Sequence, residues 1–177
     1  MNADIVTMLG NLSQSLLAVQ ALVTGSAYLI GLLFMITALS RLKKIGDSRA
    51  RGGSNEKMFI PIAYFVGGAA LIYLPTAVTV LSTTTFGSGN ILQYTQYKQY
   101  DIYKSMKVLI FTAGLIWFVR GCTLLVHASQ PGIQHGPKGL AFVCAGVMAI
   151  NFEGSVTAFN YILNNLMSFS EQISARG

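Results

Sequence analysis

Long apolar stretches separated by short polar segments dominate this chain. Each stretch holds about 22 to 25 residues, and at about 1.5 Å of rise per residue a helix of that length crosses a hydrocarbon layer of about 30 Å. Apolar and polar positions do not alternate within the stretches, as the strands of a membrane β-barrel would require. The pattern predicts an all-α, polytopic membrane helical bundle with about four transmembrane helices, at residues 16–40, 58–81, 107–128 and 140–163.

A short amphipathic helix is predicted ahead of the first span. In residues 1–15 and just beyond, apolar side chains recur at helical spacing opposite polar ones. The apolar set is Ile5, Met8, Leu9, Leu12 and Leu16, and the polar set is Asn11, Gln14 and Ser15. This helix either lies on the outer membrane surface or extends the first span. No soluble domain and no internal repeat is evident, so residues 1–177 are predicted to form one integral membrane domain.

Composition and charge agree with a lipid environment. The chain is 53% hydrophobic and 10% charged, whereas soluble domains carry roughly 25% charged residues. The net charge of +6 does not indicate nucleic-acid binding, because half of the twelve cations lie in one loop between the first two spans. The six cations of this basic loop are Arg41, Lys43, Lys44, Arg49, Arg51 and Lys57.

Cation placement also predicts the orientation of the chain. The basic loop, 41–57, is predicted to be cytoplasmic, because short cytoplasmic loops are enriched in Lys and Arg. Alternation then places Lys138 inside, and Lys98 and Lys104 outside. Both termini are therefore expected on the periplasmic side of a bacterial inner membrane.

Two charged residues fall within predicted spans, Arg120 in the third and Glu153 in the fourth. A charge at depth costs several kcal/mol unless it is paired or hydrated. We predict an intramembrane pair, formed within one hairpin or between subunits. Such a pair either fixes the helix register or lines a path, and the first role is favoured because buried pairs act chiefly as specificity devices.

Polar and small residues predict contacts between helices. Asn160 and Asn164 share one face of the fourth span, and this face is expected to be buried against protein. Small residues recur four apart, a spacing that lets helix backbones approach closely. These faces outnumber the needs of one bundle, so a homo-oligomer or a larger complex is expected.

A stripe of tyrosines at three-residue spacing precedes the third span. Its members are Tyr94, Tyr97, Tyr100 and Tyr103. We interpret the stripe as an interfacial aromatic belt. A surface for stacking or partner docking is the alternative.

No catalytic, cofactor or metal motif is present. Cys122 and Cys144 lie inside apolar stretches, and His127 and His135 have no carboxylate or thiol neighbour in sequence. The chain is therefore predicted not to be an enzyme and to need no cofactor, with a bound phospholipid left open. A transporter would show matched broken helices. Pro61 and Pro75 can break the second span, but no matching break is expected in the fourth.

The layout resembles a known family. Its length, four spans, basic first loop and Gly- and Tyr-containing outer loop resemble the IcmC/DotE (TraQ-like) inner-membrane subunits of type IVB secretion and I-type conjugation systems. The resemblance implies a component of an assembly that moves DNA or protein and is powered by separate ATPases, and it carries over no catalytic residue. The first hairpin also looks like a two-helix conjugative pilin, although two further spans follow it.

The expected function is therefore a structural or channel-forming inner-membrane subunit of a type IV transfer apparatus, together with other secretion or conjugation subunits. A pilus, a pore and a scaffold all remain open at this point. The alternative is a free-standing small membrane pore or transporter.

Overall fold

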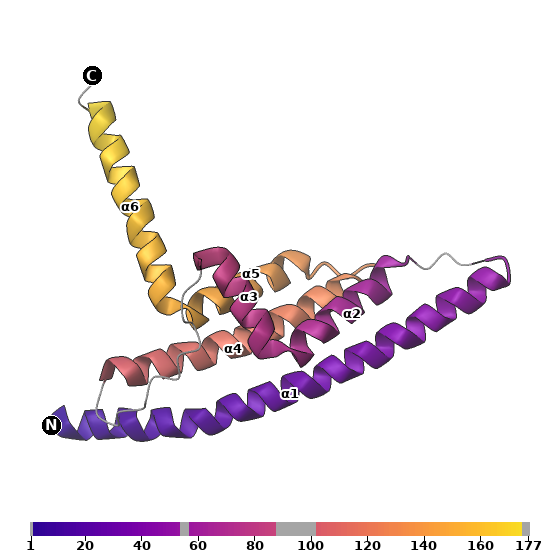
Figure 1. Cartoon of the computed structure of the whole chain (residues 1–177), viewed down its shortest axis with the longest axis horizontal. Coiled ribbons are helices and arrows are strands. Elements are labelled where there is room, and N and C mark those ends of the chain that lie inside the picture. Colours follow the sequence, from indigo (N-terminus) through magenta and orange to yellow (C-terminus); the bar gives the residue numbers. More distant parts are fainter. Residues whose placement is uncertain (1, 54–56, 88–101, 175–177) are drawn as a thin grey trace.

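The computed structural model is a bundle of helices joined by short connections (Figure 1). It describes residues 2–53, 57–87 and 102–174, and within these ranges all regular structure is helical. The helices are α1 Asn2–Ala50, α2 Phe59–Ile72, α3 Leu74–Phe86, α4 Ile102–Ala128, α5 Gly136–Ile150 and α6 Phe152–Ser174. The predicted all-α class is confirmed.

Only some of the predicted spans are single helices. Helices α1 and α4 are each long and apolar enough to cross a membrane. The stretches 58–81 and 140–163 are both broken, because α2 and α3 meet at 97° and α5 and α6 meet at 100°. The described part of the chain thus offers two candidate spans, or up to four if each bent pair counts as one.

Helix α1 is longer than the first predicted span at both ends. Its 49 residues extend for about 73 Å, more than twice the thickness of a hydrocarbon layer. Residues 2–15 continue into the span without a break, so the structure has no separate N-terminal helix. The predicted loop 41–57 is also wrong in part, because residues 41–50 are the last turns of α1.

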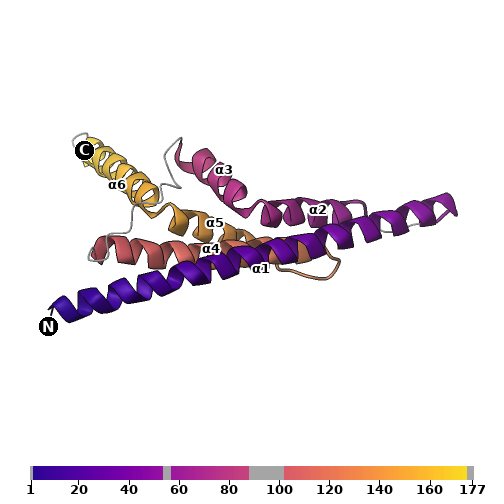
Figure 2. The same ribbon diagram turned by 60° about the horizontal axis from the view of Figure 1, so that its bottom comes forward.

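The core lies where α1, α2, α4 and α5 pack side by side (Figures 1 and 2). Phe118 of α4 and Leu71 of α2 are fully buried in it. Many other large apolar side chains remain on the surface of the single chain, including Leu22 and Leu29 of α1. Such a surface suits lipid or other protein subunits better than water.

Helix α6 departs from this bundle. It starts at the end of α5 and projects away from α1 and α4 in both views (Figures 1 and 2). All side chains from 159 to 170 are exposed in the chain. The prediction that Asn160 and Asn164 are buried against protein is therefore not met within one chain.

Candidate functional site

Two helix breaks with nearly the same geometry lie far apart in the sequence. The first is at Tyr73, with φ −99° and ψ 41°, and the second is at Asn151, with φ −103° and ψ 58°. Backbone hydrogen bonds flank the two breaks in the same way. The amide of Tyr73 donates to Ala69 O at 3.0 Å and that of Ala77 to Tyr73 O at 2.8 Å, while the amide of Asn151 donates to Val147 O at 3.0 Å and that of Ser155 to Asn151 O at 2.9 Å.

Different residues produce the two breaks. Pro75 follows the first, and it lacks the N–H that would continue the hydrogen-bond ladder of α2. At the second break, the side-chain Oδ1 of Asn151 accepts a hydrogen bond from the Gly154 amide at 3.2 Å. Asn151 thus caps the N-terminus of α6, and the helix dipole interacts favourably with the carboxylate of Glu153 in the first turn. The expectation that the fourth stretch is unbroken was wrong, and this capping pattern was the signal that could have shown it.

Each break ends a helix that crosses its neighbour at a glycine pair. A Cβ added to Gly31 would lie 2.8 Å from Gly68 O, and one added to Gly68 would lie 3.0 Å from Gly31 O. In the other hairpin, a Cβ on Gly114 would lie 3.0 Å from Gly146 O, and one on Gly146 would lie 2.9 Å from Gly114 O. Backbones therefore touch at both crossings, as small residues permit.

The crossings and breaks reveal an internal repeat. Residues 2–86 and 102–174 each consist of a long helix, a turn, a helix of 14 or 15 residues, a bend and a final helix. Gly31 corresponds to Gly114, and the segments that begin there read GLLFMITA and GLIWFVRG. Only two of these eight positions are identical, so the two units share an arrangement of helices that is hardly evident in the sequence.

The two units are staggered along the helix axis. By its glycine crossing, Gly31 corresponds to Gly114, 83 positions later. In space, however, Gln20 of α1 lies level with Thr112 of α4, 92 positions later, and donates a hydrogen bond of 2.8 Å to it. The second unit is therefore displaced by nine residues, about 14 Å, toward the end of the bundle opposite Arg41. This stagger brings the apolar run 16–40 level with 107–128.

The stagger places the breaks at different depths. A Cβ on Gly31 would meet Ile72, so the break at Tyr73 lies near the middle of the run 16–40. A Cβ on Gly114 would meet Ile150, so the break at Asn151 lies beside the middle of α4, and Glu153, two residues farther on, reaches back to Lys107. Equivalent bends thus meet different surroundings.

An ion pair marks the second break. Lys107 Nζ lies 2.9 Å from Glu153 Oε1, and the Tyr103 hydroxyl donates to the same oxygen at 3.3 Å. The side chains of Lys107 and Glu153 are 40% and 54% exposed. This pair joins α4 to α6 directly beyond the bend.

The predicted pair between Arg120 and Glu153 does not form within this chain. The Arg120 guanidinium lies over the Phe142 ring, 5.3 Å from its centroid, while Glu153 binds Lys107. The form of the prediction within one hairpin measured depth from the turn between α4 and α5 and assumed that α5 continues straight, and a pair between subunits stays a prediction. The bend at Asn151 instead holds Glu153 beside Lys107.

Substitution of these charges gives a first prediction. Lys107→Met and Glu153→Gln should show a coupling of about 0.2 to 1 kcal/mol in a double-mutant cycle, the range of exposed ion pairs. Arg120→Met and Glu153→Gln should be additive, because they do not touch. Thermal unfolding in detergent measures both cycles, and coupling confined to Arg120 would contradict the assignment.

A second cluster joins three helices near the basic end of the bundle. Tyr64 of α2, only 4% exposed, stacks edge-on against Phe34 of α1 with centroids 5.5 Å apart. Arg41 lies 5.2 Å from the centre of the Tyr64 ring, and Gln130 donates a hydrogen bond to the Tyr64 hydroxyl. Phe34 also stacks against His127 of α4 at 5.9 Å. Tyr64 thus ties the first unit to the second.

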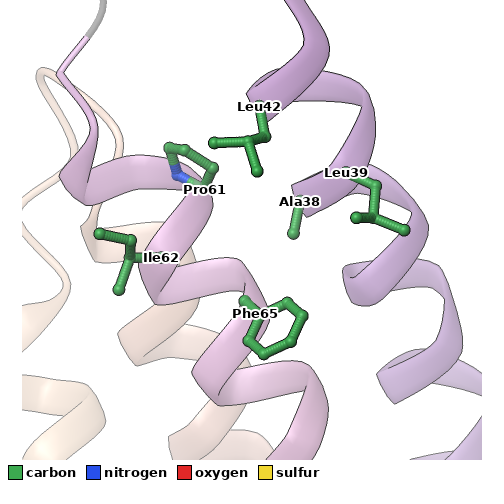
Figure 3. Close-up of a pocket in the computed structure, with 6 residues that line it drawn as sticks. All are labelled: Ala38, Leu39, Leu42, Pro61, Ile62 and Phe65. Carbon is green, nitrogen blue, oxygen red and sulfur yellow. The ribbon is translucent and has the colours of Figure 1, made fainter. Parts of the chain in front are cut away.

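An apolar notch of about 270 Å³ lies beside this cluster, between α1 and α2 (Figure 3). Ala38 and Phe65 face each other across it. The remaining lining residues are Leu39, Leu42, Pro61 and Ile62. In the second unit the equivalent position is closed, because a Cβ on Gly121 would lie 3.0 Å from Gly139 O. Pro61 and Phe65 therefore line an opening in the first hairpin that the second hairpin lacks.

The other predicted site residues are dispersed. Of the basic set, Arg41, Lys43, Lys44 and Arg49 lie on α1, whereas Arg51 and Lys57 flank the turn after it. Of the tyrosine stripe, Tyr103 lies on α4, whereas Tyr94, Tyr97 and Tyr100 lie outside the described residues. Cys122 is buried and Cys144 exposed. Among residues that the structure describes, no group of three or more His, Cys, Asp or Glu side chains could hold a metal ion.

Comparisons with known proteins do not assign a family. Scans against protein-family models, curated proteins and solved structures each found no match.

Proposed function

We propose that this chain is a non-enzymatic structural subunit of a membrane-embedded transfer apparatus of the type IV secretion or conjugation class. The main support is the amount of helix surface that one copy leaves uncovered. Helix α1 continues past its apolar run (Figure 1), and large apolar side chains such as Leu22 and Leu29 stay exposed on it. Such surfaces favour contacts with further subunits, including other copies of the chain.

The packed core of the chain favours a structural role over a role as a channel. The cluster that joins α1, α2, α4 and α5 consists of apolar side chains such as Phe118, Val119 and Val147. Among the residues that the structure describes, the buried polar side chains are Ser13, Ser82, Ser105 and Thr112, and the Thr112 hydroxyl accepts a hydrogen bond from Gln20 and donates one to its own helix. A path for ions or polar solutes would need polar or hydrated surface along its length.

Charge placement supports one orientation of this subunit. Arg41, Lys43, Lys44 and Arg49 lie on the last turns of α1, next to Arg51. These cations favour the cytoplasmic side, with both termini in the periplasm of a bacterial inner membrane. A helical basic surface there is suited to acidic partners such as a cytoplasmic ATPase or to the headgroups of anionic lipids.

Purification in mild detergent tests the proposal. We expect the chain to leave native membranes in a complex with other integral subunits, and we expect its deletion to abolish transfer of DNA or protein substrates. Reversing Lys43 and Lys44 to Glu should release cytoplasmic partners but retain membrane partners. A monomer that supports transport alone in liposomes would overturn the proposal.

A free-standing pore or transporter is the second candidate. The observation that favours it is the pair of matched breaks at Tyr73 and Asn151, because transporters often carry discontinuous helices in corresponding positions of two repeats. Flux through liposomes that contain only the purified chain would support this candidate. Loss of that flux in Asn151→Leu would connect it to the break.

A further inference from the structure

Helix α6 separates its apolar and polar side chains onto two opposite faces. The apolar face carries Phe152, Val156, Phe159, Leu163 and Leu166, spaced three or four residues apart. The polar face carries Glu153, Thr157, Asn160, Asn164 and Ser168 with the same spacing. Both faces are exposed beyond the first turns of α6, so the chain itself covers neither. A helix of this kind needs an environment that is apolar on one side and aqueous on the other.

The start of α6 has a defined depth relative to α4. Glu153 in its first turn is held by Lys107, at the polar end of the apolar run 107–128. From there α6 turns by 100° relative to α5, which packs along α4. If α4 crosses the bilayer, α5 does so alongside it, and α6 therefore runs nearly parallel to the membrane surface.

The equivalent helix of the first unit provides an internal comparison. Helix α3 follows the mid-depth break and carries no charged residue. Four of its threonines donate to carbonyls of their own helix, as Thr79 does to Pro75 O at 2.8 Å and Thr84 to Val80 O at 2.7 Å, whereas the buried Ser82 hydroxyl has no partner. Self-satisfied hydroxyls suit an environment without water. Helix α6, displaced by about 14 Å in the stagger, has self-bonded hydroxyls at Thr157 and Ser168 too, but it also carries asparagines and Glu153, which α3 lacks.

We propose that α6 is an interfacial helix that lies flat on the outer surface of the bilayer. Its apolar face enters the boundary between headgroups and acyl chains, and Asn160 and Asn164 face water. The described side chains of α6 include no cation. Its binding therefore depends on burial of apolar surface, and zwitterionic lipid is sufficient.

Spin labels on the full chain in phosphatidylcholine nanodiscs test this inference. With Cys122 and Cys144 replaced by Ala, single cysteines are introduced as Phe159→Cys, Leu166→Cys and the matched neighbours Asn160→Cys and Asn164→Cys. We expect oxygen to broaden the signals at 159 and 166, and a water-soluble nickel chelate to broaden those at 160 and 164. Positions 159 and 166 should lie at equal depth, and addition of phosphatidylglycerol should leave the pattern unchanged.

Four other outcomes would overturn the inference. A helix that completes a span would place positions 159 and 166 about 10 Å apart in depth. An arm in water would expose all four labels to the nickel chelate, and a helix covered by another copy would shield 159 and 166 from both reagents. An impermeant maleimide on intact cells should label Asn164→Cys but not Gly53→Cys, and the reverse would place α6 on the inner surface.

Discussion

Gly31→Ala and Gly114→Ala are expected to destabilise the chain by about 1 to 3 kcal/mol each, the usual cost of forcing an extra methyl group into a packed contact. At Gly31 the new Cβ would lie 2.8 Å from Gly68 O and 2.9 Å from Ile72 N. At Gly114 it would lie 3.0 Å from Gly146 O and 2.9 Å from Ile150 Cγ1. A contact with backbone cannot be relieved by a side-chain rotation, so the helices must separate. Thermal unfolding in detergent measures the loss.

Gly25 provides a matched control in the same helix. A Cβ there meets nothing within 4 Å, so Gly25→Ala removes the same backbone freedom without a clash. Helix propensity alone favours this substitution by roughly 0.5 to 1 kcal/mol. Equal melting temperatures for Gly25→Ala and Gly31→Ala would show that the hairpins do not cross at the glycines.

Tyr64→Ala is expected to cost about 3 kcal/mol or more, the range for truncation of a buried aromatic ring. The ring is 4% exposed and contacts Phe34 and Arg41, and its hydroxyl accepts a hydrogen bond from Gln130. Removal of the ring therefore weakens the contact between the two units. Limited proteolysis of the full chain, with cleavage followed separately in each half, would detect this change. Tyr64→Phe should cost about 1 kcal/mol, because it leaves the Gln130 amide without its partner.

Tyr161→Ala is the control for this substitution. Tyr161 lies on α6 and is 70% exposed, so its loss should leave the melting temperature of the bundle within about 1 °C, as for surface substitutions generally. If Tyr64→Ala were as mild as Tyr161→Ala, the cluster at the basic end would not hold the units together.

The bends at Tyr73 and Asn151 explain why the hydropathy pattern predicted the helices but not where they end. Each apolar stretch was detected correctly as helical, because hydropathy over a window of about 20 residues reports whether a segment tolerates lipid. The same window averages across a bend. The stretch 140–163 therefore appeared continuous, although Asn151 stood at its break, whereas in the stretch 58–81 Pro75 indicated a possible break two residues beyond the observed one at Tyr73.

The amino-acid sequence by itself determined three things: that the helices are apolar enough for lipid, that the secondary structure is helical, and that the cations are unevenly distributed. Long apolar stretches with few charges favour lipid over water as the environment. In lipid the backbone N–H and C=O groups must be hydrogen-bonded within the segment, and a helix satisfies this requirement. Only the tertiary structure decided that Glu153 meets Lys107, that Arg120 lies over Phe142, and that two similar units are staggered by about 14 Å. These features depend on the register between helices. Register is set by backbone contacts such as Gly31 with Gly68, between residues far apart in the chain, and no local pattern of polarity records it.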